Sequence, residues 1–155
     1  MTRSNFGVRL AEVGDIADIF RIMESCCKNP WKREQLEEEL RHDFSRLAVV
    51  ERGEDICGFV LFHIVREDAH INELAVDLPF RRQGAATELM EFCVAEAKKN
   101  ECAAIGLEVR SANRAAKGLY RSLGFEPLGV RGGFYRDPED DAVVMRLKLT
   151  PGVFV

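Results

Sequence analysis

Apolar residues recur along the chain at two spacings, and each spacing predicts a different kind of element. Alternation of apolar with polar or small residues over Phe6, Val8 and Leu10 predicts a short first strand. Recurrence at three and four residues between Ile16 and Cys27 predicts a helix with one apolar face, which the Asn29-Pro30 pair should end. The chain is therefore expected to open with a strand followed by a helix.

A second helix, rich in glutamate, is predicted to begin at Pro30-Trp31. Its apolar residues Trp31, Leu36 and Leu40 should face inward. That leaves the acidic residues on the outer side, and these are Glu34, Glu37, Glu38 and Glu39. Such a cluster is usually a solvated face, and the alternative is a role in attracting a basic partner.

The remaining pattern predicts two more helices and six more strands. Apolar residues at three- and four-residue spacing from Ala86 to Ala97 predict the longest helix, and another should run from Asn113 to Gly124, a glycine typical of a helix C-terminus. The predicted strands are 47–51, 56–65, 70–76, 103–109, 125–131 and 142–149, with a hairpin turn at 52–55 and a loop at 132–141. The strand-helix-strand unit over 70–109 should place the fourth and fifth strands parallel and side by side. These elements predict an α/β (α+β) fold.

Composition restricts the classes of function. With 155 residues and no internal repeat or linker, the sequence predicts a single domain over residues 1–155. A formal net charge of −4 at pH 7 argues against direct nucleic-acid binding, which usually requires a basic face, and is compatible with a basic protein or peptide partner. The five cysteines include no C-x-x-C pair, and neither a metal-ligand cluster, a signal sequence nor a membrane-length apolar run is present. We therefore expect a reduced, cytoplasmic chain without a metal site or a membrane segment.

A candidate anion site lies where the fourth strand passes into the longest helix. The strand should end with Leu74, Ala75 and Val76, and the helix should begin near Gly84 in the run Arg81-Arg82-Gln83-Gly84-Ala85-Ala86. The first backbone N–H groups of a helix lack intrahelical acceptors and lie at the positive end of its dipole, so they can bind a pyrophosphate. The run matches neither the P-loop nor the G-x-G-x-x-G pattern. An ordinary strand-to-helix connection with solvated arginines is the alternative.

One carboxylate is isolated in the fifth predicted strand. Alternation gives this strand one face with Ile105, Leu107 and Val109 and another with Ala104, Gly106 and Glu108. Glu108 thus lies on an otherwise small and apolar surface, which makes it a candidate for acid–base chemistry. The alternative is a structural ion pair with a nearby arginine, Arg110 or Arg114.

Taken together, these residues resemble the GCN5-related N-acetyltransferase superfamily. Its R-x-x-G-x-A pattern is matched by the run from Arg81 to Ala86, which follows the apolar strand LAV. Within the superfamily the sequence is most similar to the bacterial ribosomal-protein alanine N-terminal acetyltransferases, through the stretches PWKREQLEEEL, LEVRSANRAAKGLYRSLGF and DAVVM. The resemblance covers nearly the whole chain and implies a mostly antiparallel, mixed sheet of seven strands, in which the parallel strands four and five splay apart, with four flanking helices.

The resemblance implies acetyl-coenzyme A (acetyl-CoA) as the acetyl donor. Proteins of this family hold its pantetheine arm along the splayed fourth strand, here Leu74, Ala75 and Val76. They bind its pyrophosphate with the amides of the following loop, here Arg82, Gln83, Gly84, Ala85, Ala86 and Thr87. Asn113 matches an asparagine that contacts the cofactor. From its position alone, Asn113 is equally a helix N-cap, and one side chain could do both.

The same resemblance implies two catalytic residues. The glutamate of LEVR, here Glu108, serves as general base, and the tyrosine seven residues after the asparagine, here Tyr120, serves as general acid. Acetyl transfer to an amine needs both, because a neutral nitrogen must attack and the departing thiolate must be protonated. Read from the pattern alone, Tyr120 is more often a core residue. A covalent cysteine mechanism is the lesser alternative, since no cysteine has a histidine in a recognisable local arrangement.

For the acceptor, the resemblance implies a protein N-terminus, that of a ribosomal protein. It would lie in a groove between the acidic second helix, with Trp31, and the segment 131–141, where Tyr135 matches a subfamily tyrosine. The sequence departs from the subfamily at Phe134, where a tyrosine is usual, and at Gly132-Gly133, where residues are bulkier. A lysine side chain, a small amine and a non-catalytic acyl-CoA-binding role stay open as alternatives, and so does the choice between monomer and dimer.

Overall fold

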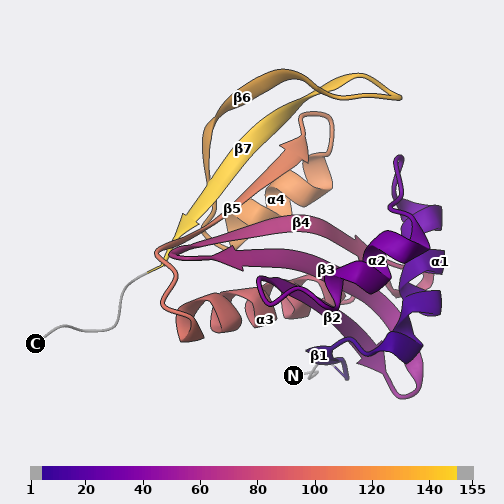
Figure 1. Cartoon of the computed structure of the whole chain (residues 1–155). Helices are drawn as coiled ribbons and strands as arrows, with labels where there is room; N and C mark the ends of the chain where they lie inside the picture. The colour runs from indigo at the N-terminus through magenta and orange to yellow at the C-terminus, as the bar shows by residue number, and fades with distance from the viewer. Residues whose placement is uncertain (1–4, 150–155) are drawn as a thin grey trace, which may run out of the picture. The chain divides into compact units, whose positions relative to one another are not determined.

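The computed structural model describes residues 5–149, which contain seven strands and four α-helices. The strands are β1 (Gly7–Leu10), β2 (Ser45–Arg52), β3 (Asp55–Val65), β4 (Asp68–Val76), β5 (Ala104–Arg110), β6 (Glu126–Tyr135) and β7 (Asp140–Lys148). The helices are α1 (Ile16–Cys26), α2 (Arg33–Glu39), α3 (Ala85–Lys99) and α4 (Arg114–Ser122), and single 3₁₀ turns occur at Val13–Asp15 and Leu78–Phe80 (Figure 1).

The strands form one mixed sheet in the order β1-β2-β3-β4-β5-β7-β6. Antiparallel pairs join β1 to β2, β2 to β3, β5 to β7 and β6 to β7. The β4–β5 pair is parallel, with a register that runs from Asp68↔Ala104 to His70↔Gly106. The predicted α/β (α+β) architecture, with its parallel fourth and fifth strands, is confirmed.

The described chain forms two compact units. The first contains residues 5–63 and 72–95, and the second contains residues 64–71 and 96–149. The bounds of β3, β4 and α3 show that each of these elements runs from one unit into the other.

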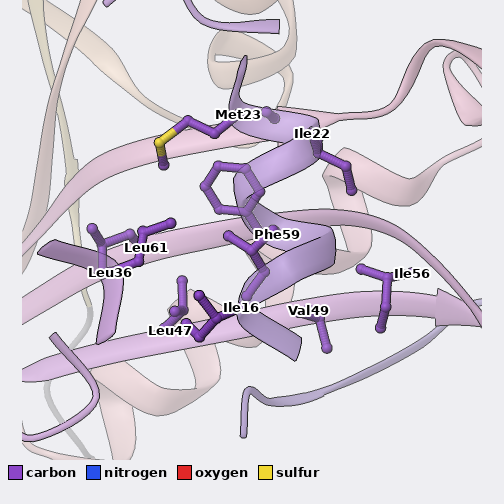
Figure 2. Packing of buried hydrophobic residues seen from close by; sticks show 11 residues of the cluster. Ile16, Ile22, Met23, Leu36, Leu47, Val49, Ile56, Phe59 and Leu61 are labelled. Atoms are coloured by element: carbon purple, nitrogen blue, oxygen red, sulfur yellow. The ribbon is translucent and has the colours of Figure 1, made fainter. Parts of the chain in front are cut away.

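In the first unit, α1 and α2 pack on one face of β2 and β3. The three- and four-residue spacing of α1 buries Ile16, Ile19, Ile22 and Met23, and α2 adds Leu36 (Figure 2). Strand alternation supplies the facing side chains, which are Leu47, Val49, Phe59 and Leu61. Residues 85–95 of α3 lie on the opposite face, where the rings of Phe62 and Phe92 meet edge to face at 6.4 Å between centroids.

In the second unit, alternation along β5 buries Ile105, Leu107 and Val109, as predicted. Helix α4 ends at Ser122 with Leu123 as its C-cap, and Gly124 follows with φ +99°, the left-handed conformation expected of a C-terminal glycine. The helix docks through Tyr120, whose ring centroid lies 5.7 Å from that of Phe125.

Two sequence-based expectations are wrong. The predicted loop at 132–141 is too long, because β6 extends to Tyr135 and β7 begins at Asp140, which leaves residues 136–139 as the turn. An irregularity in the β6–β7 register between Arg131 and Tyr135, with Gly133 at φ +62°, absorbs the glycine pair inside the strand. Glu39 is not on a solvated face either, since its side chain is 11% exposed and accepts hydrogen bonds from His63 Nε2 at 2.5 Å and Ser45 Oγ at 2.9 Å.

Candidate functional site

The connection from β4 to α3 is fixed by side chains of the first unit. Arg81 Nε donates to the carbonyl of Val76 at 2.9 Å, and its Nη2 lies 3.3 Å from Cys26 Sγ. Asp77 caps the 3₁₀ turn by accepting from the Leu78 amide, and Arg21 donates to its other oxygen at 3.1 Å. Arg81 therefore links the loop to the end of β4 and to α1.

The loop presents the open amides that the sequence predicts. Helix α3 begins at Ala85, so the amides of residues 85–87 belong to its first turn and have no i−4 acceptor in the helix. Gly84 adopts φ +95°, which favours glycine, and no atom lies within 4 Å of the Cβ position. Gln83 points away, with its Oε1 accepting from Arg52 and its Nε2 donating to Pro79. These amides and small side chains fit a pyrophosphate.

The end of β4, where Leu74, Ala75 and Val76 lie, depends on a glycine that the sequence reading missed. A Cβ on Gly58 of β3 would lie 2.6 Å from the carbonyl oxygen of Ala75 and 3.1 Å from Cα of Val76. The backbones of β3 and β4 therefore approach more closely here than any side chain allows. The signal in the sequence, one glycine inside an apolar strand, indicates such an approach.

Glu108 has a histidine partner in the second unit. His70 Nε2 lies 2.8 Å from Glu108 Oε2 and 3.1 Å from Oε1, and because a carboxylate only accepts hydrogen bonds, the imidazole is the donor. The Glu108 side chain is 18% exposed and that of His70 is 44% exposed. Arg110, which the sequence offered as an alternative partner, instead donates to the carbonyls of Pro138 at 2.8 Å and Arg136 at 3.2 Å.

The other predicted residues of the second unit lie on α4 and β6. Asn113 caps α4, with Oδ1 accepting from the Ala116 amide at 3.0 Å, as the N-cap interpretation predicted. Tyr120 is 7% exposed, which its core interpretation also predicted. Tyr135 lies at the end of β6, where the Arg110 guanidinium stacks over its ring at 4.5 Å. Their roles in binding and catalysis remain predictions.

Trp31, the predicted acceptor contact of the first unit, is partly buried beside α1. It packs on the apolar cluster of Figure 2, and its amide lies 3.1 Å from Met23 Sδ. Its side chain also hydrogen-bonds Glu73, a carboxyl on β4 that the sequence reading missed. Burial raises the pKa of Glu73, and hydrogen bonds from Cys27 and Trp31 oppose that rise.

Burial makes three of the five cysteines poor nucleophiles. Burial raises the pKa of the Cys27 thiol to about 12, and Glu73 adds to the rise. Burial also raises the pKa values of Cys57 and Cys102. Because the thiolate is the reactive form, these three thiols are poorly suited to covalent catalysis at neutral pH.

No group of three or more histidine, cysteine, aspartate or glutamate side chains in residues 5–149 could hold a metal ion. Across the same residues, none of the helices has the length and hydropathy needed to span a bilayer.

Comparison with known proteins decides the family. The family model described as "Acetyltransferase (GNAT) family" matches residues 16–125, which is more than half of the chain. The chain belongs to the GNAT acetyltransferase family. The resemblance inferred from the loop at Arg81–Ala86 and the LEVR stretch is thus confirmed at the level of the family, and this GNAT protein is an acetyltransferase.

Within this family, the chain is similar to proteins named as ribosomal protein bS18-alanine N-acetyltransferases. A ribosomal protein bS18-alanine N-acetyltransferase of Escherichia coli (strain K12) is 28% identical over 141 residues, 90% of this chain and 95% of that protein. One from Haemophilus ducreyi is 28% identical over 138 residues, 87% of this chain and 94% of that protein. The crystal structure of the ribosomal-protein-S18-alanine N-acetyltransferase from Escherichia coli superposes with a TM-score of 0.85 at 25% identity, covering 97% of this GNAT chain and 99% of that one.

Proposed function

We propose that this GNAT enzyme transfers the acetyl group of acetyl-CoA to the N-terminal α-amine of a protein, namely the N-terminal alanine of a ribosomal protein. The match to the GNAT family model supports acetyl transfer as the reaction. Similarity to bS18-alanine N-acetyltransferases over about nine-tenths of each chain supports the acceptor, and a cytoplasmic location follows from such a substrate.

The donor would be held by residues of the β4–α3 connection. The amides of Arg82, Gln83, Gly84, Ala85, Ala86 and Thr87 would bind the pyrophosphate, and this is supported by the small side chains and the first-turn amides at residues 85–87. The backbone of residues 74–76 would hold the pantetheine arm, and Asn113 would add a contact. When bound, acetyl-CoA supplies the thioester carbonyl.

Glu108 and Tyr120 would move the protons of the reaction. Glu108 accepts a proton from the acceptor amine, whose nitrogen forms the new bond to the acetyl carbon while the carbon–sulfur bond breaks. Tyr120 gives its phenolic proton to the departing sulfur, so a neutral thiol leaves. The low exposure of the Glu108 side chain, 18%, and the valine that pairs opposite it on β7 support this assignment, because the site is largely shielded from bulk water.

An α-amine suits a carboxylate base. Its pKa is about 7.7–8.0 against about 10.4 for lysine, so roughly a tenth of it is already neutral near pH 7. Lysine in the same site would need a far stronger base. The departures at Phe134 and Gly132-Gly133 leave a lysine or small-amine acceptor as the second candidate.

A peptide panel tests the proposal. Purified enzyme and acetyl-CoA are incubated with an alanine-starting peptide, a copy blocked at its N-terminus but bearing lysine, and spermidine, and the products are read by mass spectrometry. Acetylation of the free N-terminus, lost in Glu108→Gln and reduced in Tyr120→Phe, supports it. Turnover of the blocked peptide or the polyamine alone would assign the second candidate, and cofactor binding without any turnover would assign a non-catalytic module.

A further inference from the structure

The imidazole of His70 reaches Glu108 because of the parallel register between β4 and β5. His70 pairs with Gly106, and Glu108 is the next residue on the same face of β5. Gly106 has no side chain to stand between them, and a Cβ there would lie 3.8 Å from His70 Cδ2. The histidine therefore leans along β5 and places Nε2 2.8 Å and 3.1 Å from the two carboxylate oxygens.

No second polar side chain competes for this carboxylate in residues 5–149. On the other side of β5, the antiparallel strand β7 places Val144 opposite Glu108. Arg110, two residues along β5, is turned toward the backbone at Arg136 and Pro138. The direction in which the carboxylate points is thus set by His70.

We infer that His70 is a positioning residue for the base of the reaction, an inference that rests on the proposed function of Glu108. A glutamate side chain has three rotatable bonds, and a half-buried one without a fixed donor samples several rotamers. One bifurcated hydrogen bond from the Nε2–H of His70 to Oε1 and Oε2 of Glu108 restrains both oxygens. The lone pairs that do not face His70 stay available to accept a proton from the amine. Small misplacements of a catalytic group can cost about 100-fold in rate, so this restraint matters for kcat.

Substitutions at His70 test the inference on the full chain. His70→Leu keeps the volume and removes the donor, whereas His70→Gln keeps an N–H donor at nearly the same reach. We expect His70→Leu to lower kcat about 10- to 100-fold with little change in KM for peptide or acetyl-CoA. His70→Gln should restore most of kcat. The matched control is His42→Ala, which removes another histidine next to a glutamate and should leave both constants unchanged.

The outcomes separate this inference from the proposed function. If Glu108→Gln abolishes turnover while His70→Leu keeps its kcat, Glu108 stands as base and the positioning role of His70 is wrong. If His70→Gln is as impaired as His70→Leu, the imidazole itself is required and positioning is again wrong. If Glu108→Gln keeps its kcat, the proposed base is wrong and the inference about His70 is overturned with it. Should His70→Leu fold poorly by circular dichroism, His70→Ala takes its place in the same comparison.

Discussion

Asn113 serves the fold whatever else it contacts, because its Oδ1 accepts a hydrogen bond from the Ala116 amide at 3.0 Å. Loss of an N-cap side chain costs about 0.5–2 kcal/mol, so Asn113→Ala should lower the free energy of unfolding by that amount in urea titrations. Asn113→Asp keeps a cap oxygen and should keep most of the stability. If the side-chain amide nitrogen of Asn113 also contacts the cofactor, Asn113→Asp should weaken acetyl-CoA binding, as measured by calorimetry, although it keeps the cap. Unchanged affinity would leave the cap as the sole role of Asn113.

Glu73 should make the protein less stable as the pH rises from acid to neutral. Burial raises its pKa in the folded state, so the folded chain binds this proton more tightly than the unfolded chain does. Its contribution is therefore favourable in acid and is lost progressively as pH rises from about 4.3 through the raised pKa. Glu73→Gln, which cannot ionise, should be more stable than the native chain at pH 7, and the difference should shrink to nothing near pH 4.

Urea unfolding of both proteins between pH 4 and pH 8 measures this difference. Titrations common to the two chains cancel, and a surface variant, Glu54→Gln, controls for the loss of one negative charge. A gap between Glu73→Gln and the native chain that stays constant over this range would contradict the assignment.

At the scale of elements, the close approach of β3 and β4 at Gly58 makes a sharp prediction. In Gly58→Ala the new Cβ would meet the Ala75 carbonyl oxygen at 2.6 Å, and backbone cannot move aside as a side chain can. Overpacking of this kind costs about 1–3 kcal/mol. Residues 74–76 of β4, which would hold the pantetheine arm, must then shift. The affinity for acetyl-CoA should therefore fall as well. Gly7→Ala on β1, with no atom within 4 Å of its Cβ position, is the control and should change neither quantity.

The spacing of apolar residues was enough to predict most elements, and the exceptions have local causes. The α1 helix follows directly from its pattern, since its buried residues recur at three- and four-residue spacing. The β2–β3 hairpin follows from two apolar runs on either side of the turn at 52–55. The end of β6 was missed because Gly132-Gly133 has the composition of a turn, and only pairing with β7 shows that an irregular strand accommodates it.

In the candidate site, too, local features could be predicted from the sequence and long-range contacts could not. The amide loop and the cap at Asn113 are local features, so a short run of residues predicts them. The partners of Glu108 and Glu39 are not local. His70 reaches Glu108 through the register between β4 and β5, and His63 of β3 reaches Glu39 on α2, and one sequence reveals neither arrangement. Closeness in sequence suggested Arg110 or Arg114 as the partner of Glu108. The register between β4 and β5 makes His70 the partner instead.

At the scale of the whole molecule, the prediction that residues 1–155 form a single domain can be tested by unfolding. The single tryptophan, Trp31, reports on the first unit, and the two tyrosines, Tyr120 and Tyr135, report on the second. Because β3, β4 and α3 each continue from one unit into the other, opening either unit disrupts elements of its neighbour. We therefore expect one cooperative transition, with the same urea midpoint by tryptophan fluorescence, tyrosine signal and far-ultraviolet circular dichroism. The tyrosine signal is read in Trp31→Phe, with circular dichroism of that variant as its own reference, so that energy transfer to tryptophan does not mask it. Two separated midpoints would show that the units unfold independently and that the chain is better described as two domains.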